Sequence, residues 1–158
     1  MPMRGLIGSD LLAVRPDWKV INNPLAADGV RDPIAIIPAV RPDVALFHAA
    51  KADVHGNVWI GIRRELMLMA HASKATFVTV EDIVDGNLLH DPAWAAGTIP
   101  SLYITSLAVA PGGAAPIGLA DCYEPDNKAL AAYAASARTV DGFAAWLPQL
   151  LDREAVSA

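Results

Sequence analysis

The chain has 158 residues, of which 54% are apolar and 18% charged, and its formal net charge is −5. This length predicts one domain, residues 1–158. The absence of any basic run argues against a nucleic-acid partner, and no apolar run approaches the length of a membrane-spanning helix. A single cysteine, Cys122, rules out an internal disulfide and is typical of a protein of the reducing cytoplasm; a lone cysteine of this kind is more often a small core residue than a nucleophile.

The first third of the chain predicts short strands and little helix. Prolines at six positions oppose a long helix there, namely Pro2, Pro16, Pro24, Pro33, Pro38 and Pro42. One helical turn is expected at Leu11 and Leu12, with Ser9 or Asp10 as its N-cap. The runs 33–40 and 43–49 lack polar alternation, which favours strands buried on both faces of a parallel sheet.

The middle of the chain predicts a strand–helix–strand unit. Residues 57–62 are expected to form a strand and 75–84 another. Between them, the apolar residues of 62–74 recur with the helical period, whereas Arg63 and Arg64 fall off that face. This order predicts a right-handed parallel crossover.

The last third predicts one more strand and two helices. The strand covers 101–111, and a loop rich in glycine and proline follows. Asp126 is expected to cap a helix over 127–138, and Thr139 a helix over 140–147 that Pro148 limits. Because the helices are concentrated late in the chain, one face of the sheet is expected to be apolar and exposed, ready to be covered by something that this chain lacks.

The stretch "HAAKADVHGNVWIG", residues 48–61, permits three interpretations. His48, Asp53 and His55 are potential metal ligands, but their spacing matches no known site, so no metal is predicted. Gly56 and Asn57 favour a turn in which Asp53 accepts backbone hydrogen bonds. The third interpretation is acid–base or phosphate-binding chemistry with His48, because ligands of open α/β sheets bind at the carboxyl ends of strands.

A resemblance to a known family extends these interpretations. The segment "PDVALFHAAKADVHGNVWIG" resembles the A (alpha) subunit of family I CoA-transferases, which carries a strand, an A-x-x-A-D-x-x-G-N loop and another strand. The loop residues are Ala49, Ala52, Asp53, Gly56 and Asn57. "MAHASKATFVTVEDIVD" and "GTIPSLYI" also match, with Glu81 and Pro100 at family positions. "LIGSDLL", "IPAVRPDVA" and "APGGAAPIGLADCYEPDN" are similar to the glutaconate CoA-transferase branch.

The resemblance implies a fold and an activity. The fold would be the α/β type of that family, a mostly parallel sheet with flanking helices, here as the C-terminal half of a chain about twice as long. The complete enzyme would move CoA from an acyl-CoA to a free carboxylic acid through a glutamyl-CoA intermediate. CoA would be a substrate, and no permanently bound cofactor is expected. The expected partners are a B-type (beta) subunit, a chain supplying the missing N-terminal half, or both, in an oligomer.

The resemblance also divides the candidate residues. The CoA or substrate pocket candidates are His48, Asp53, His55, Gly56 and Asn57, whereas Glu81 and Pro100 are expected to be structural. No catalytic residue is expected, because the chain lacks both the oxyanion loop and the Glu-x-Gly-type motif of the nucleophile. The available glutamates are Glu65, Glu81, Glu124 and Glu154. Two alternatives stay open: a hydrolase subunit that cleaves a ring in a CoA thioester, and a non-catalytic assembly or regulatory module.

Overall fold

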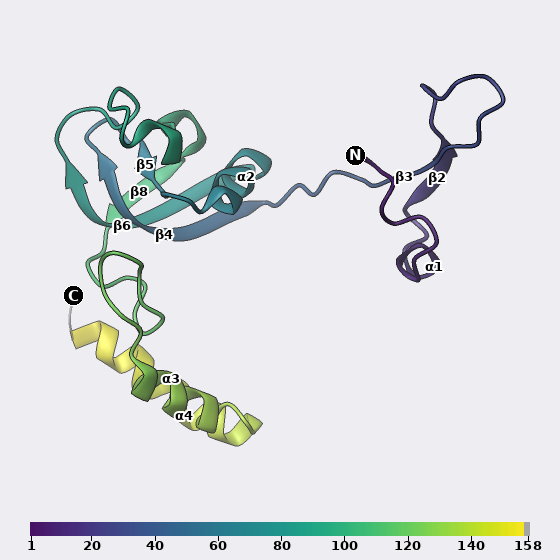
Figure 1. Ribbon diagram of the computed structural model, residues 1–158. Helices are drawn as coiled ribbons and strands as arrows, with labels where there is room; N and C mark the ends of the chain where they lie inside the picture. The colour runs from purple at the N-terminus through teal and green to yellow at the C-terminus, as the bar shows by residue number, and fades with distance from the viewer. Residues whose placement is uncertain (157–158) are drawn as a thin grey trace. The chain divides into compact units, whose positions relative to one another are not determined.

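The structure is a computed structural model that describes the backbone of residues 1–156 and the side chains of residues 1–151. The chain divides into two compact units, Met1–Pro42 and the remainder from Asp43 (Figure 1). The single domain predicted over residues 1–158 stays a prediction. None of the described helices has the length and apolar character needed to cross a bilayer.

The first unit contains a three-stranded antiparallel sheet in the order β1-β3-β2. Its elements are β1 (Pro2–Met3), α1 (Leu11–Val14), β2 (Lys19–Asn22) and β3 (Pro33–Ile36). The strand predicted over 33–40 is present as β3 but ends at Ile36. Its assignment to a parallel sheet was wrong, because β3 pairs antiparallel with both of its neighbours. The expected helical turn is present as α1, although the Asp10 side chain makes no capping hydrogen bond.

The second unit is built on a five-stranded mixed sheet in the order β7-β5-β4-β6-β8. Its strands are β4 (Val44–Asp53), β5 (Val58–Trp59), β6 (Ala75–Val84), β7 (Thr98–Ile99) and β8 (Ser106–Val109). β4, β6 and β8 run parallel, whereas β5 and β7 are antiparallel to their neighbours. The α/β class is thus confirmed, with two antiparallel strands at one side of a parallel centre.

Several predicted boundaries in this sheet change. β6 has the predicted bounds and pairs parallel with β4. β4 continues past residue 49 to Asp53, because its last residues pair with both β5 and β6. The strand predicted over 57–62 shortens to β5, because residues 61 and 62 form a turn before α2. The strand predicted over 101–111 shortens to β8, because a short 3-10 turn, η2 (Ser101–Tyr103), takes up its first residues, and another, η1 (Ala95–Gly97), precedes β7.

The two faces of the sheet differ in what covers them. Helix α2 (Arg64–Ala72) packs its Leu66 and Met69 against a buried cluster that includes Phe47 and Val78. On the opposite face Leu46 is 71% exposed and pairs in register with Phe77, which is 40% exposed. The exposed apolar sheet face expected from the sequence is therefore present.

The chain ends in two helices, α3 (Asn127–Ser136) and α4 (Val140–Val156). The capping predictions are confirmed, because the Asp126 side chain accepts from two backbone amides of α3 and Thr139 Oγ1 accepts from the Gly142 amide. The predicted stop at Pro148 is wrong, since α4 continues through it. Proline removes one amide donor from a helix, and the alanine- and leucine-rich turn before it favours helix strongly enough to continue.

Candidate functional site

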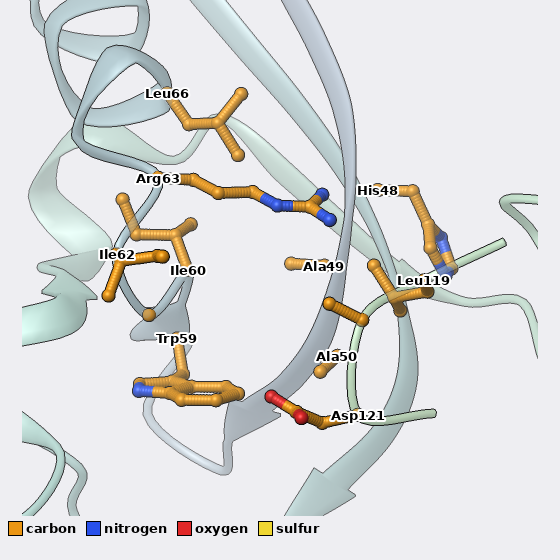
Figure 2. Close-up of a pocket in the computed structure, with 12 residues that line it drawn as sticks. His48, Ala49, Ala50, Trp59, Ile60, Ile62, Arg63, Leu66, Leu119 and Asp121 are labelled. Carbon is orange, nitrogen blue, oxygen red and sulfur yellow. The ribbon is translucent and has the colours of Figure 1, made fainter. Parts of the chain in front are cut away.

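A small cavity lies beside β4 where β5 no longer pairs with it. Its volume is about 190 Å³. The walls come from β4, from the β5–α2 segment and from the loop that follows β8 (Figure 2). The lining residues are His48, Ala49, Ala50, Trp59, Ile60, Gly61, Ile62, Arg63, Leu66, Leu119, Ala120 and Asp121. Of the predicted pocket residues, only His48 lines this cavity.

The imidazole of His48 uses both of its ring nitrogens within the protein. Nε2 lies 2.6 Å from Glu81 Oε1, and Nδ1 lies 2.8 Å from Thr79 Oγ1. A carboxylate only accepts hydrogen bonds, so Nε2 carries the proton and donates a hydrogen bond to Glu81. In the neutral imidazole, Nδ1 then accepts from the Thr79 hydroxyl. The ring is therefore held in one orientation at the cavity wall.

The carboxylate of Glu81 joins the sheet to the loop after β8. Besides His48, its Oε1 accepts from the Tyr123 hydroxyl at 2.8 Å, and its Oε2 accepts from the Gly112 amide at 2.8 Å. The Tyr123 oxygen in turn accepts from the Ala114 amide. Both carboxylate oxygens are thus occupied, and these contacts are those of a residue that anchors a loop.

The hydrogen bonds around Glu81 also set the pKa values of the cluster. Burial by itself would raise the pKa of Glu81, but the donors Gly112, Tyr123 and His48 outweigh it and lower the pKa below its ordinary value. Burial raises the pKa of Tyr123, and the hydrogen bond to Glu81 raises it further. The cluster therefore favours an ionised Glu81 beside a neutral Tyr123.

The loop between β4 and β5 is organised by Asp53, which is 1% exposed. Oδ1 accepts from the amides of His55 and Asn57, and Oδ2 accepts from the Asn57 side chain and the Leu88 amide. Burial acts to raise the pKa of Asp53, but these four donors together lower it. A buried carboxylate with this many donors has little capacity left for a ligand.

The other predicted loop residues have distinct places. Asn57 is buried, and its Oδ1 accepts from the Ser101 amide, next to Pro100, which precedes the turn η2. Gly56 has a φ of +82°, in the left-handed region that glycine adopts without strain. His55 is exposed. The loop is therefore held together internally, and none of Asp53, His55, Gly56 and Asn57 lines the cavity.

The structure does not bring the three potential metal ligands together. His48 contacts Thr79 and Glu81, Asp53 is satisfied by amides, and His55 is exposed. Within the described residues, no three histidine, cysteine, aspartate or glutamate side chains are placed to hold a metal ion. The expectation that Cys122 is a core residue was wrong, because its side chain is exposed.

Three further residues of the cavity region were not predicted from the sequence. Lys51 Nζ lies 4.3 Å from the ring centroid of Trp94 and 5.5 Å from that of Trp59. The two indoles meet edge to face with centroids 5.0 Å apart, an arrangement that stabilises aromatic pairs. This stack fixes the Trp59 wall of the cavity. The only feature of the sequence that pointed to this arrangement was Trp59, which lies within a predicted strand.

Similarity to proteins of known function is extensive, although no family model matches the chain. The chain is 37% identical over 153 residues to the A subunit of 3-oxoadipate CoA-transferase from Pseudomonas knackmussii, and the match covers 94% of this chain and 51% of that protein. It is 31% identical over 143 residues to the A subunit of glutaconate CoA-transferase from Acidaminococcus fermentans, with 87% of this chain and 43% of that protein covered.

The fold comparison agrees with the sequence comparison. The crystal structure of the Acidaminococcus fermentans glutaconate CoA-transferase matches with a TM-score of 0.71 at 27% identity, over 94% of this chain and 51% of that one. This chain is homologous to CoA-transferase A subunits. It spans about half the length of the curated relatives it matches.

Two other relatives carry different activities in their names. The decarboxylase AibA/AibB matches with a TM-score of 0.78 at 32% identity, over 96% of this chain and 53% of that chain. The cholesterol ring-cleaving hydrolase IpdA subunit of Rhodococcus jostii is 30% identical over 147 residues, covering 88% of this chain and 49% of that protein. The same scaffold therefore occurs in proteins named for three kinds of reaction.

Proposed function

We propose that this chain is one half of an A-type subunit in an enzyme that moves CoA from an acyl-CoA to a free carboxylic acid. The observation that carries this proposal is the homology to two CoA-transferase A subunits over 87% and 94% of the chain. CoA is then a substrate rather than a bound cofactor, and the partner is a B-type subunit.

The proposal assigns the nucleophile to another chain. Covalent transfer of this kind needs a glutamate carboxylate with a free oxygen to attack the thioester carbonyl. Glu81 has no free oxygen, because it accepts from His48, Tyr123 and Gly112. Glu65 and Glu124 are exposed and do not line the cavity, and the side chain of Glu154 lies outside the described residues.

The chemistry proposed for the complete enzyme is a two-stage exchange. A glutamate from the B-type partner attacks the acyl-CoA carbonyl, and the CoA thiolate leaves, which produces an acyl-glutamyl anhydride. The thiolate then attacks the glutamyl carbonyl and releases the first carboxylate, leaving glutamyl-CoA. The acceptor carboxylate repeats both steps in reverse order. In this scheme the chain supplies one wall of the pocket, with His48 in that wall and the Asp53–Asn57 loop supporting it.

Two features of the sheet support a partner. Val44 and Leu46 expose apolar side chains on the face of the sheet opposite α2, and residues 44–50 of β4 have no described strand beside them on the β5 side. An apolar face and an unpaired strand edge favour association with further structure. We propose that the complementary half of the subunit, on this or another polypeptide, covers them within an oligomer. Because its single thiol is exposed at Cys122, a reducing cytoplasm is the proposed location.

The test is the intact mass of the protein after reaction with an acyl-CoA and then borohydride, with and without a B-type subunit. Borohydride reduces a glutamyl-CoA thioester and leaves a mass change that peptide mapping can locate. The proposal expects the change only on the B-type subunit. A change on this chain would overturn the assignment of the nucleophile, and no change on either chain would contradict the transferase.

A ring-cleaving hydrolase is the second candidate, favoured by the similarity to the IpdA subunit. It predicts a different product from the same mixture, because water rather than a carboxylate is consumed. Product analysis with isotope-labelled water separates the two: label in a ring-opened thioester would support the hydrolase, whereas CoA found on the added carboxylic acid would support the transferase. A non-catalytic module predicts neither product.

A further inference from the structure

The loop that follows β8 forms one wall of the cavity and is joined to the sheet at few points. This loop, residues 112–126, supplies the lining residues Leu119, Ala120 and Asp121 (Figure 2). Leu119 is its only buried residue. Among the described residues, every hydrogen bond between the loop and the sheet ends on the carboxylate of Glu81. Segments with few buried apolar contacts open at a low cost in free energy, so this wall is the one most easily moved.

Glu81 holds the two ends of the loop with separate oxygen atoms. Its Oε2 accepts from the Gly112 amide at 2.8 Å, and its Oε1 accepts from the Tyr123 hydroxyl at 2.8 Å. Gly112 begins the loop, and Tyr123 lies close to its end. One side chain of β6 therefore fixes both ends of the loop beside the cavity.

The loop is also bonded to itself, independently of the sheet. Leu119 and Tyr123 exchange two backbone hydrogen bonds of 2.9 Å, and the Asp126 amide donates to the Pro116 carbonyl. The Ala114 amide donates to the Tyr123 hydroxyl. Compact loops of this kind, whose ends lie close together, are called Ω-loops. Because none of these bonds involves the sheet, they need not break when the contacts with Glu81 do.

The loop also has space beside it. A second groove, of about 890 Å³, lies between the loop and helices α3 and α4, with Pro116 and Ile117 on the loop side and Tyr133 and Trp146 on the helix side. Protein interiors have few voids of this size, so close packing does not lock the loop in place. Gly112, with a φ of +75°, offers a point at which the backbone can change direction.

We propose that residues 112–126 are a lid that opens as one body and gives access to the cavity beside β4, and that Glu81 is the latch that holds it shut. This inference goes beyond the proposed function, because lid and latch depend only on contacts within this chain. When the two latch contacts break, Leu119 leaves the cavity wall. Ala49, which lies on the β4 wall and is 3% exposed, then becomes accessible to solvent.

The reactivity of a thiol placed in the cavity tests the opening without any catalysis. The full chain first receives Cys122→Ser, which removes its exposed thiol. Ala49→Cys then places a thiol on the cavity wall. Ala45→Cys is the matched control, because Ala45 is a buried alanine of the same strand that does not line the cavity. The probe is iodoacetamide, and mass spectrometry follows the rate of alkylation.

We expect the thiol at position 49 to react at least about tenfold faster than the thiol at position 45, because local opening is more frequent than global unfolding. Glu81→Gln replaces one acceptor oxygen of the latch by a donor. Hydrogen bonds to a charged group are strong enough for their loss to change an opening equilibrium about tenfold or more, so alkylation at position 49 should accelerate by that factor. Asp82→Asn is the control for the latch, because Asp82 is exposed and its side chain accepts only from the Ile83 amide.

Hydrogen exchange measured by NMR distinguishes a lid that moves as one body from a loop that unfolds. In Glu81→Gln, the Gly112 amide loses its acceptor and should exchange about tenfold faster. The amides of Leu119 and Tyr123 donate to each other's carbonyls and should keep their rates. Asp82→Asn should change neither set.

The outcomes separate clearly. Faster alkylation at position 49 alone, together with faster exchange at Gly112 alone, supports the lid. Equal alkylation at positions 49 and 45 overturns it, because both thiols then react only through global unfolding. A rate at position 49 that Glu81→Gln leaves unchanged overturns the latch, and faster exchange at Leu119 and Tyr123 overturns movement as one body.

A second variant keeps the proposal testable if Glu81→Gln does not fold. Tyr123→Phe removes one of the two latch contacts, and the same results at position 49 and at Gly112 then support or overturn the lid. None of these measurements depends on the transfer of CoA, so a failed lid leaves the proposed function standing, and a failed transferase leaves the lid standing.

Discussion

His48 and Glu81 lie 33 positions apart in the sequence, yet Nε2 of the histidine is 2.6 Å from Oε1 of the glutamate. The parallel register of β4 and β6 creates this contact, because it places His48 beside Thr79 and leaves Glu81 two residues further along the same face. The pair then connects the sheet to the loop after β8 through Tyr123. The geometry of the cavity wall therefore depends on strand register.

We expect Glu81 and Tyr123 to be energetically coupled. Glu81→Ala removes the acceptor for the Tyr123 hydroxyl, and Tyr123→Phe removes that hydroxyl, which also accepts from the Ala114 amide. Each single variant should lower the free energy of unfolding. The loss in the double variant should be smaller than the sum of the two single losses by about 0.5–3 kcal/mol. Urea denaturation of the four proteins measures this coupling, and strict additivity would show that the loop is not held by this contact.

Gly113 is expected to tolerate no larger residue while His48 is present. A Cβ at this position would lie 2.7 Å from Cε1 and Nδ1 of the His48 ring. Gly113→Ala should therefore cost about 1–3 kcal/mol of stability, as overpacking does, and His48→Ala should relieve part of that cost in the double variant. The control is Gly5→Ala, because nothing lies within 4 Å of a Cβ built there. A Gly113→Ala protein as stable as the control would contradict the close approach.

Asp53 is expected to be essential for the stability of the second unit. Asp53→Asn changes one acceptor oxygen to a donor, facing amide groups that already donate. Leaving buried donors unsatisfied costs about 1–3 kcal/mol each, so we expect a loss of about 2–4 kcal/mol in urea denaturation. Asp85→Asn, at an exposed position, serves as the control with the same change of charge. Equal stability of the two variants would remove Asp53 from the structural role.

Stability should fall on the acid side because of Asp53 and Glu81. Both have folded-state pKa values below their ordinary values, so the unfolded chain binds their protons first. Their contribution is fully present above the unfolded pKa values near 4 and is lost as the pH falls through the folded values. Thermal unfolding measured between pH 7 and pH 2 checks this. In Asp53→Asn, the unfolding temperature should fall less steeply as the pH is lowered. An unchanged slope in that variant would count against the assignment.

Tyr123 should lower the stability of the folded protein at high pH rather than at low pH, because its folded pKa is raised. Its contribution is present below the unfolded pKa of about 10 and is lost as the pH rises through the folded value. Tyr123→Phe should therefore remove part of the loss of stability above pH 10, which the same unfolding series, extended to alkaline pH, measures.

The exposed apolar part of the sheet face opposite α2 is expected to bind an apolar dye. Leu46 is 71% exposed beside Phe77, so Leu46→Gln interrupts a contiguous patch. We expect lower dye fluorescence with a change in unfolding free energy of no more than about 0.5 kcal/mol, as for surface substitutions. Leu102→Gln is the control, since Leu102 is 83% exposed but lies on the turn η2 outside the sheet. Equal fluorescence changes in both variants would mean that no patch exists there.

Local signals in the sequence were sufficient for several elements. The β-branched run of β6 predicted its bounds, and Asp126 predicted the start of α3, because strand propensity and helix capping act over a few residues. The scarcity of helix early in the chain also indicated the exposed apolar face. The resemblance of residues 42–61 to CoA-transferase A subunits, visible in the sequence alone, agrees with the homology found over most of the chain.

Only the tertiary structure decided which of these residues meet. The sequence alone determined that Asp53, Gly56 and Asn57 form a turn, since the turn is local. It did not indicate that Glu81 would bind His48 and Tyr123, or that Arg63 would enter a cavity beside β4. Those contacts follow from strand register and from the path of a long loop, and both are fixed by packing between segments distant in the chain.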